Sequence, residues 1–175
     1  DADGTDELVL ARATSGLELH GWSVDRYGRL PGSVGLDAGR TGVVTDLAAG
    51  PAIAAGGRPA VFVVHDQPIG SGAEPRVSTL LVDPGPSLVD PRAETALQDA
   101  PRALLVGNFE TVGGVTGELL VAFSDRLELF ENDGLGQHAS RAVLAAQGIV
   151  PASLAGLWAD QGAAPRGAVF LLDDG

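Results

Sequence analysis

The chain has 175 residues, of which 25 are glycine and 11 are proline, and it contains neither cysteine nor methionine. Its 23 acidic residues face 11 arginines and no lysine, so the formal net charge is -12. This charge argues against nucleic acid or an anionic membrane surface as the partner. The lack of cysteine excludes a disulfide framework, a thiol nucleophile and a zinc-thiolate site. No apolar run approaches the roughly 18 residues of a membrane-spanning helix, so membrane insertion is not expected.

Short apolar runs between glycine-rich and proline-rich segments predict an all-β chain. In chain order, strands are expected at Leu8–Ala11, Leu17–Leu19, Gly42–Thr45, Val61–Val64, Val77–Val82 and Ala103–Val106, and further strands start near Leu119, Leu127 and Val169. Turns and loops are expected at Gly28–Gly42, Gly70–Pro75 and Asp83–Pro91. Short helical insertions are expected at Pro91–Leu97, Gln137–Gln147 and Pro151–Leu157.

Two pairs of segments indicate an internal repeat. Residues 7–22 (ELVLARATSGLELHGW) and 118–132 (ELLVAFSDRLELFEN) both run from Glu through three apolar residues and Ala to a turn and Leu-Glu-Leu. Alternation in Leu-Glu-Leu places the leucines on one face of a hairpin and the glutamate on the other. Residues 58–66 (RPAVFVVHD) match 166–174 (RGAVFLLDD) in the same way.

The matches interleave, so the strand cores recur about every 50–58 residues, which is the size of one propeller blade. The sequence therefore predicts a single partial β-propeller domain over 1–175, with about three blades and short helical insertions. Its units are expected at approximately 1–52, 53–104 and 105–155, and 156–175 begins a fourth.

Oxygen ligands are concentrated at the N-terminus, where the chain reads Asp1-Ala2-Asp3-Gly4-Thr5-Asp6-Glu7. Alternate carboxylates in a sharply turning loop suit a hard cation, and calcium accepts six to eight oxygens in a flexible geometry. The expected metal ligands are Asp1, Asp3, the carbonyl of Thr5, and Glu7.

Residues 1–10 and the hairpin to Trp22 resemble an FG-GAP/VCBS-type repeat, the blade unit of integrin-α-like β-propellers. In that family a loop of the form Asp-x-Asp-x-Asp-Gly-x-x-Asp precedes a strand and often holds calcium, so the resemblance implies calcium at the first loop. The third, fifth, sixth and ninth places of the loop are filled here by Asp1, Asp3, Gly4 and Glu7. The third unit fits more loosely, and its weaker set of metal ligands is Asn108, Glu110 and Glu118.

Other chemistries find less support. The three histidines, His20, His65 and His138, have no metal-ligand spacing, and His20 and His65 are interpreted as satisfied structural residues. No Gly-x-Ser-x-Gly elbow or Walker-type phosphate loop is present. Trp22, Tyr27 and Trp158 are candidates for stacking on a sugar, although buried aromatics at a blade edge are the commoner outcome.

The expected function is binding or scaffolding by a secreted or cell-surface bacterial protein with a calcium-stiffened loop, which takes a protein or carbohydrate ligand. About three blades cannot close a ring, so the rest of a longer chain or other subunits are expected to complete it. The alternatives are a calcium-dependent polysaccharide-acting enzyme and a structural subunit of a large surface or toxin assembly. A different fold is also open, in which 60–64 and 119–123 are buried parallel strands and 137–147 is a crossover helix.

Overall fold

Every regular element that the structure describes is a β-strand. The computed structural model describes residues 8–12, 16–23, 26–29, 44–53, 58–83, 87–109, 117–133, 136–150, 153–157 and 167–173. Within these ranges all strand pairs are antiparallel. They contain no helix, and hence none with the length and apolarity to cross a membrane. The prediction of an all-β chain is confirmed for this part of the protein.

The strands form four sheets, and each sheet uses strands that follow one another in the chain. The first sheet consists of β1 (Leu8–Arg12), β2 (Gly16–Ser23) and β3 (Arg26–Arg29). The second consists of β4 (Val44–Ile53), β5 (Arg58–Ile69), β6 (Gly72–Asp83) and β7 (Ser87–Ala96). The third consists of β8 (Ala103–Gly107), β9 (Glu118–Ala122), β10 (Arg126–Asn132) and β11 (His138–Ala145), and the fourth of β12 (Ala155–Leu157) and β13 (Gly167–Val169).

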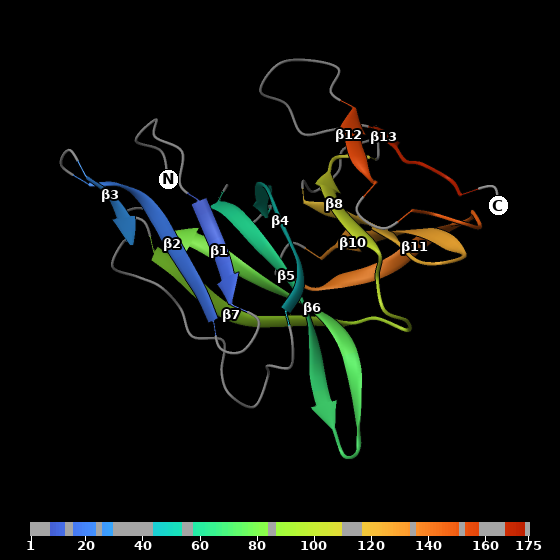
Figure 1. Cartoon of the computed structure of the whole chain (residues 1–175), viewed down its shortest axis with the longest axis horizontal. Coiled ribbons are helices and arrows are strands. Elements are labelled where there is room, and N and C mark those ends of the chain that lie inside the picture. The colour runs from blue at the N-terminus through green and yellow to red at the C-terminus, as the bar shows by residue number, and fades with distance from the viewer. Residues whose placement is uncertain are drawn as a thin grey trace.

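The sheets follow one another in space in the same order as in the chain. Strand β1 lies beside β4, β4 lies beside β8, and β8 lies beside β12. Figure 1 shows this progression from the blue first sheet to the orange and red third and fourth sheets. The alternative of buried parallel strands is wrong, because β5 and β9 each pair with antiparallel neighbours on both sides.

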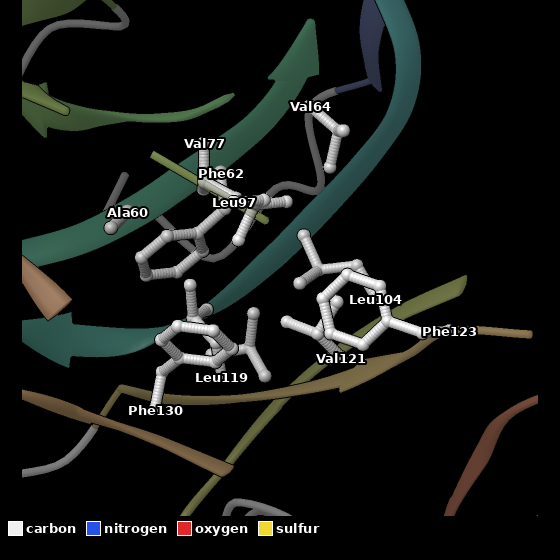
Figure 2. Close-up of a cluster of buried hydrophobic side chains, with 11 residues drawn as sticks. Ala60, Phe62, Val64, Val77, Leu97, Leu104, Leu119, Val121, Phe123 and Phe130 are labelled. Atoms are coloured by element: carbon white, nitrogen blue, oxygen red, sulfur yellow. The ribbon is translucent and has the colours of Figure 1, made fainter. Parts of the chain in front are cut away.

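The second and third sheets pack face to face through the main hydrophobic core. Figure 2 shows Phe62 from β5 and Phe130 from β10 pointing into this shared layer. The buried members of the layer, the main cluster, are Ala60, Phe62, Val64, Val77, Leu97, Leu104, Val106, Leu119, Val121, Phe123 and Phe130. Each fully buried Phe or Leu contributes about 1.5–3 kcal/mol relative to an exposed position, so this layer holds the two sheets together.

A second cluster lies between the third sheet and the fourth. Its buried members are Ala103, Ala122, Leu127 and Ile149, with Leu120, Ala146, Leu154 and Phe170 packed against them. The third sheet is thus covered on both faces, which explains why β8 (ALLVG) and β9 (ELLVA) are apolar at nearly every position instead of alternating.

The expected hairpin around Leu-Glu-Leu is present as β9 and β10. Leu127 belongs to the second cluster, whereas Glu128 lies opposite Val121 of the main cluster, so leucine and glutamate occupy opposite faces as predicted. Glu128 is nevertheless buried. Arg126 on the same strand pairs with its carboxylate and offsets the cost of burying it.

The three expected helices are wrong. Residues 91–96 belong to β7 and 138–145 to β11, while 155–157 form β12. The apolar spacing in 137–147 looks helical, but β11 pairs with β10 along its length, and this ladder satisfies the backbone. Pro91 lies in edge strand β7 where its pairing with β6 shifts register, a position that tolerates proline. The expected loop at 83–91 also becomes strand from Ser87 onward.

The β5–β6 hairpin projects beyond its sheet, as Figure 1 shows at the lower edge. Strand β4 pairs with β5 only as far as His65, and β7 pairs with β6 only from Arg76, so the tip between them is two-stranded. The observed turn is shorter than the predicted range Gly70–Pro75, because Ile69 already pairs with Gly72 and only Gly70 and Ser71 lie between them. Gly70 has a φ of 59°, the conformation that such tight hairpin turns require.

Gly148 fixes the segment that leads to the fourth sheet. The Asp173 N–H donates to the Gly148 carbonyl at 2.7 Å, and Gly148 has a φ of 73°. A Cβ at this position would collide with the carbonyl oxygen of Asp173. Only glycine allows this close approach between the connection and the C-terminal strand segment.

Candidate metal and polar site at the β8–β9 loop

The structure describes two of the sequence-predicted metal ligands. Asn108 and Glu118 flank the loop between β8 and β9, at the mouth of that hairpin, where Gly107 pairs with Glu118. The other predicted ligands lie outside the described residues: Asp1, Asp3, Thr5, Glu7 and Glu110. The candidate site is therefore the β8–β9 loop mouth.

Glu118 closes this loop mouth. Its side chain is buried, and its Oε2 atom accepts a hydrogen bond from the Phe109 N–H at 2.5 Å. A backbone donor bound to an ionised carboxylate forms a short, charge-assisted bond. The bond ties the end of β8 to the start of β9.

Asn108, the next residue after β8, adds a second buried oxygen at this end of the hairpin. Its Oδ1 atom is buried and has no hydrogen-bond partner within the described part of the chain. Buried polar atoms are nearly always satisfied by protein groups, water or an ion. Amide and carboxylate oxygens are ligands that calcium accepts, so the chemistry of Asn108 and Glu118 fits such an ion.

His138, the first residue of β11, joins the loop mouth to the second sheet. Its Nε2 atom donates to the Gly117 carbonyl at 3.1 Å, and its backbone N–H donates to Thr95 Oγ1 at 3.0 Å. Its ring meets the ring of Phe62 edge to face, with centroids 5.6 Å apart. Sequence reasoning did not select His138 or Thr95, because their partners are 21 and 43 residues away and no local spacing marks them.

Burial of the His138 ring lowers its pKa below the usual 6.5, although the hydrogen bond to the Gly117 carbonyl, the charge of Asp133 and the backbone of Gly136 oppose the shift. The Nδ1 atom is buried and has no hydrogen-bond partner among the described residues. A second proton on the ring would therefore place a charged N–H where no described acceptor meets it. The folded protein binds this proton more weakly than the unfolded chain does.

We expect His138 to make the fold less stable in mild acid. Because its pKa is depressed in the folded state, its contribution is complete above about pH 6.5 and is lost as the pH falls below that value. Urea unfolding of the wild type and of His138→Gln at pH 7.5, 6.5 and 5.5 measures this. The cost of the substitution should shrink as the pH falls, and a cost independent of pH would contradict the assignment.

A second polar cluster crosses the second sheet from β5 to β7. His65 Nε2 and Ser78 Oγ are 2.8 Å apart, and Ser78 Oγ lies 3.4 Å from Glu94 Oε1. Arg76 continues the chain of contacts with hydrogen bonds to Glu94 at 3.1 Å and to Glu74 at 2.6 Å. We call these five residues the polar ladder.

The polar ladder has the residue types of a hydrolase triad but not its order. In a triad the histidine connects the serine to the acid, whereas here Ser78 lies between His65 and Glu94. His65 and Ser78 are also fully buried, which leaves no access for a substrate. The buried, hydrogen-bonded state of His65 agrees with its interpretation as a satisfied structural residue.

Within the described ranges, no group of three or more His, Asp and Glu side chains gathers in a way that could hold a metal ion. Comparisons of the chain with protein-family models, with curated proteins and with solved structures gave no match. Functional inference therefore depends on the sequence and on the geometry of the β8–β9 loop mouth.

Proposed function

We propose that the protein is a secreted or cell-surface binding and scaffolding module of the β-propeller type, with a loop stiffened by calcium. The observation that carries this proposal is the buried carboxylate of Glu118, which accepts from Phe109 N–H at the β8–β9 loop mouth, together with the buried Oδ1 of Asn108, which has no hydrogen-bond partner in the described part of the chain. Antiparallel four-stranded sheets of consecutive strands, stacked in chain order, support the propeller architecture.

In this proposal Asn108 and Glu118 hold the ion, and Glu110 completes the set that the sequence predicts. When bound, the ion supplies positive charge that neutralises Glu118 and ties the loop to the hairpin mouth. The loop then presents a fixed surface to a protein or carbohydrate ligand. Loops held by a rigid sheet scaffold are the usual place for binding residues.

Calcium titration by calorimetry tests the proposal. We expect wild-type protein to bind calcium with a dissociation constant of about 10⁻⁴–10⁻³ M, the range of extracellular modules. Glu118→Gln should lose this binding while keeping the fold, because the amide oxygen of Gln can still accept from the Phe109 N–H. At a calcium concentration of about 100 times the dissociation constant, the bound ion should add about 2.7 kcal/mol to the stability of the wild type.

Two matched variants make the titration specific. Glu131→Gln removes an acid that is half exposed on β10, and it should leave calcium binding unchanged. Asp3→Asn removes a predicted ligand of the first loop, so any second binding event belongs to that loop if this variant loses it. Wild-type protein that releases no heat with calcium, or a Glu118→Gln variant that binds like the wild type, would refute the calcium site.

A further inference from the structure

The second and third sheets are joined by hydrogen bonds as well as by the main cluster. Their last strands, β7 and β11, meet at the Thr95 hydroxyl, which accepts from the His138 N–H at 3.0 Å and lies 3.4 Å from the His138 carbonyl oxygen. Two residues before His138, the Gly136 carbonyl accepts from Thr79 Oγ1 on β6 at 2.8 Å. The side chains of Thr79, Thr95 and His138 are all buried. Two hydroxyl groups of the second sheet therefore hold the β10–β11 turn.

The Thr95 hydroxyl takes the place of a neighbouring strand for His138. On the β10 side, the Asp133 N–H donates to the Gln137 carbonyl at 2.9 Å, so the next pair in the ladder, Asn132 and His138, is of the non-hydrogen-bonded type. The backbone N–H and carbonyl of His138 consequently point away from β10, where Thr95 meets them. A buried N–H that loses its acceptor is left unsatisfied, which destabilises that conformation. Thr95 thus fixes the position of the first residue of β11.

His138 connects Thr95 to the β8–β9 loop mouth. Its Nε2 atom donates to the carbonyl of Gly117, which has a φ of 91°. Glycine gives the backbone freedom to reorient at this point, and the bond from His138 restrains it. The next residue, Glu118, accepts from the Phe109 N–H across the loop mouth. Each member of this series is joined to the next by a hydrogen bond or a peptide bond, and we call the series the Thr95 network: Thr95, His138, Gly117, Glu118 and Phe109.

We propose that Thr95 is a positioning residue for the β8–β9 loop mouth and that it acts through His138. While the Thr95–His138 bond is formed, Gly117 and Glu118 are held in place, and when this bond opens, the Phe109–Glu118 bond opens with it. The inference rests on the proposed function, because it makes the affinity of Asn108 and Glu118 for their ion depend on a contact between two sheets.

Native-state hydrogen exchange of the wild type tests the Thr95 network without a substitution. Proteins open locally in cooperative groups of residues, so the His138 and Phe109 N–H groups should exchange through one opening with the same dependence on urea concentration. The Phe123 N–H, which donates to the Arg126 carbonyl at the other end of β9, is the control and should follow a separate opening. Different urea dependences for His138 and Phe109, or a common one that Phe123 also follows, would overturn the proposal.

Substitutions of Thr95 separate its hydroxyl group from its packing. Thr95→Val keeps the shape of the side chain but leaves the His138 N–H unsatisfied, so the protection of the Phe109 N–H should fall about tenfold relative to that of Phe123. Thr95→Ser keeps the hydroxyl and should restore the wild-type ratio. Ser78→Ala is the matched control, because it removes a buried hydroxyl from the opposite face of the same sheet, and the ratio should not change. A ratio that Thr95→Val leaves unchanged, or that Thr95→Ser does not restore, contradicts a positioning role.

Calcium titration of the same variants distinguishes this inference from the proposed function. If both are correct, Thr95→Val should weaken calcium binding about tenfold, within the usual range of coupling between sites, and Thr95→Ser should bind like the wild type. Calcium binding that Thr95→Val leaves unchanged refutes this inference alone. A wild type that binds no calcium refutes the proposed function, and hydrogen exchange then still decides whether Thr95 holds the loop mouth.

Discussion

Replacing Phe62 with alanine is expected to lower the free energy of unfolding by about 3–5 kcal/mol. Phe62 is fully buried in the main cluster, where its side chain joins the second sheet to the third. The substitution removes apolar contacts from both sheets and leaves a cavity that packed strands cannot easily collapse into. Since domains of this size are stable by about 5–15 kcal/mol, the loss is a large share of the total.

Urea unfolding followed by circular dichroism measures this effect. Ile69→Ala is the matched control, because Ile69 lies on the same strand but is 52 % exposed, and its substitution should change the stability by less than about 0.5 kcal/mol. Phe62→Ala should also reduce the pH dependence assigned to His138, whose ring it contacts. A loss below about 1 kcal/mol would show that the two sheets do not depend on this packing.

Replacing Arg126 with methionine is expected to cost about 3 kcal/mol, because it leaves the buried carboxylate of Glu128 without this cation. Arg126 Nε donates to Glu128 at 3.2 Å, and its guanidinium carbon lies 4.1 Å from the centroid of the Phe123 ring. It also pairs with Asp99 and Asp125, but both of these side chains are mostly exposed and such pairs contribute little. The buried partner therefore decides the effect.

A double-mutant cycle separates the charge from the packing. Arg126→Met/Glu128→Leu should recover most of the stability lost in Arg126→Met, since replacing both members of a buried pair by apolar residues is often nearly neutral. Arg141→Met is the control, because its contact with Glu131 at 3.8 Å joins two side chains that are more than half exposed. If Arg126→Met and Arg141→Met cost the same, the burial of Glu128 is not what makes Arg126 important.

Strand positions were the most predictable feature of the chain. The expected cores at Val61–Val64, Ala103–Val106 and Val77–Val82 all lie within observed strands, because short apolar runs bounded by turn residues have few alternatives. The β9–β10 hairpin was predictable for the same reason, since Leu-Glu-Leu alternates with the strand period. The helix predicted at 137–147 from the spacing of its apolar residues is wrong, because 138–145 form β11 and pair with β10.

The candidate site was predictable only where its residues are close in sequence. Asn108 and Glu118 flank one loop, so a motif could select them, and the structure places them at the same hairpin mouth. His138, at the start of β11, contacts Gly117, which precedes β9, and the two residues are separated in the chain by β9 and β10. Its other partner, Thr95, comes from another sheet. No local pattern encodes such contacts.

The sequence by itself determined where several strand cores lie, because hydrophobic period and turn residues act over a few positions. Whether these strands pair in parallel or antiparallel, and that 138–145 is a strand and not a helix, was decided by the tertiary structure. The sequence also determined that strands such as β5, β8 and β9 are apolar on both sides. Only the tertiary structure decided which faces are covered, because burial depends on sheets that meet from distant parts of the chain. That is why Val61 is buried and its counterpart Val169 is exposed, although the segments 58–66 and 166–174 that carry them are identical at five of nine positions.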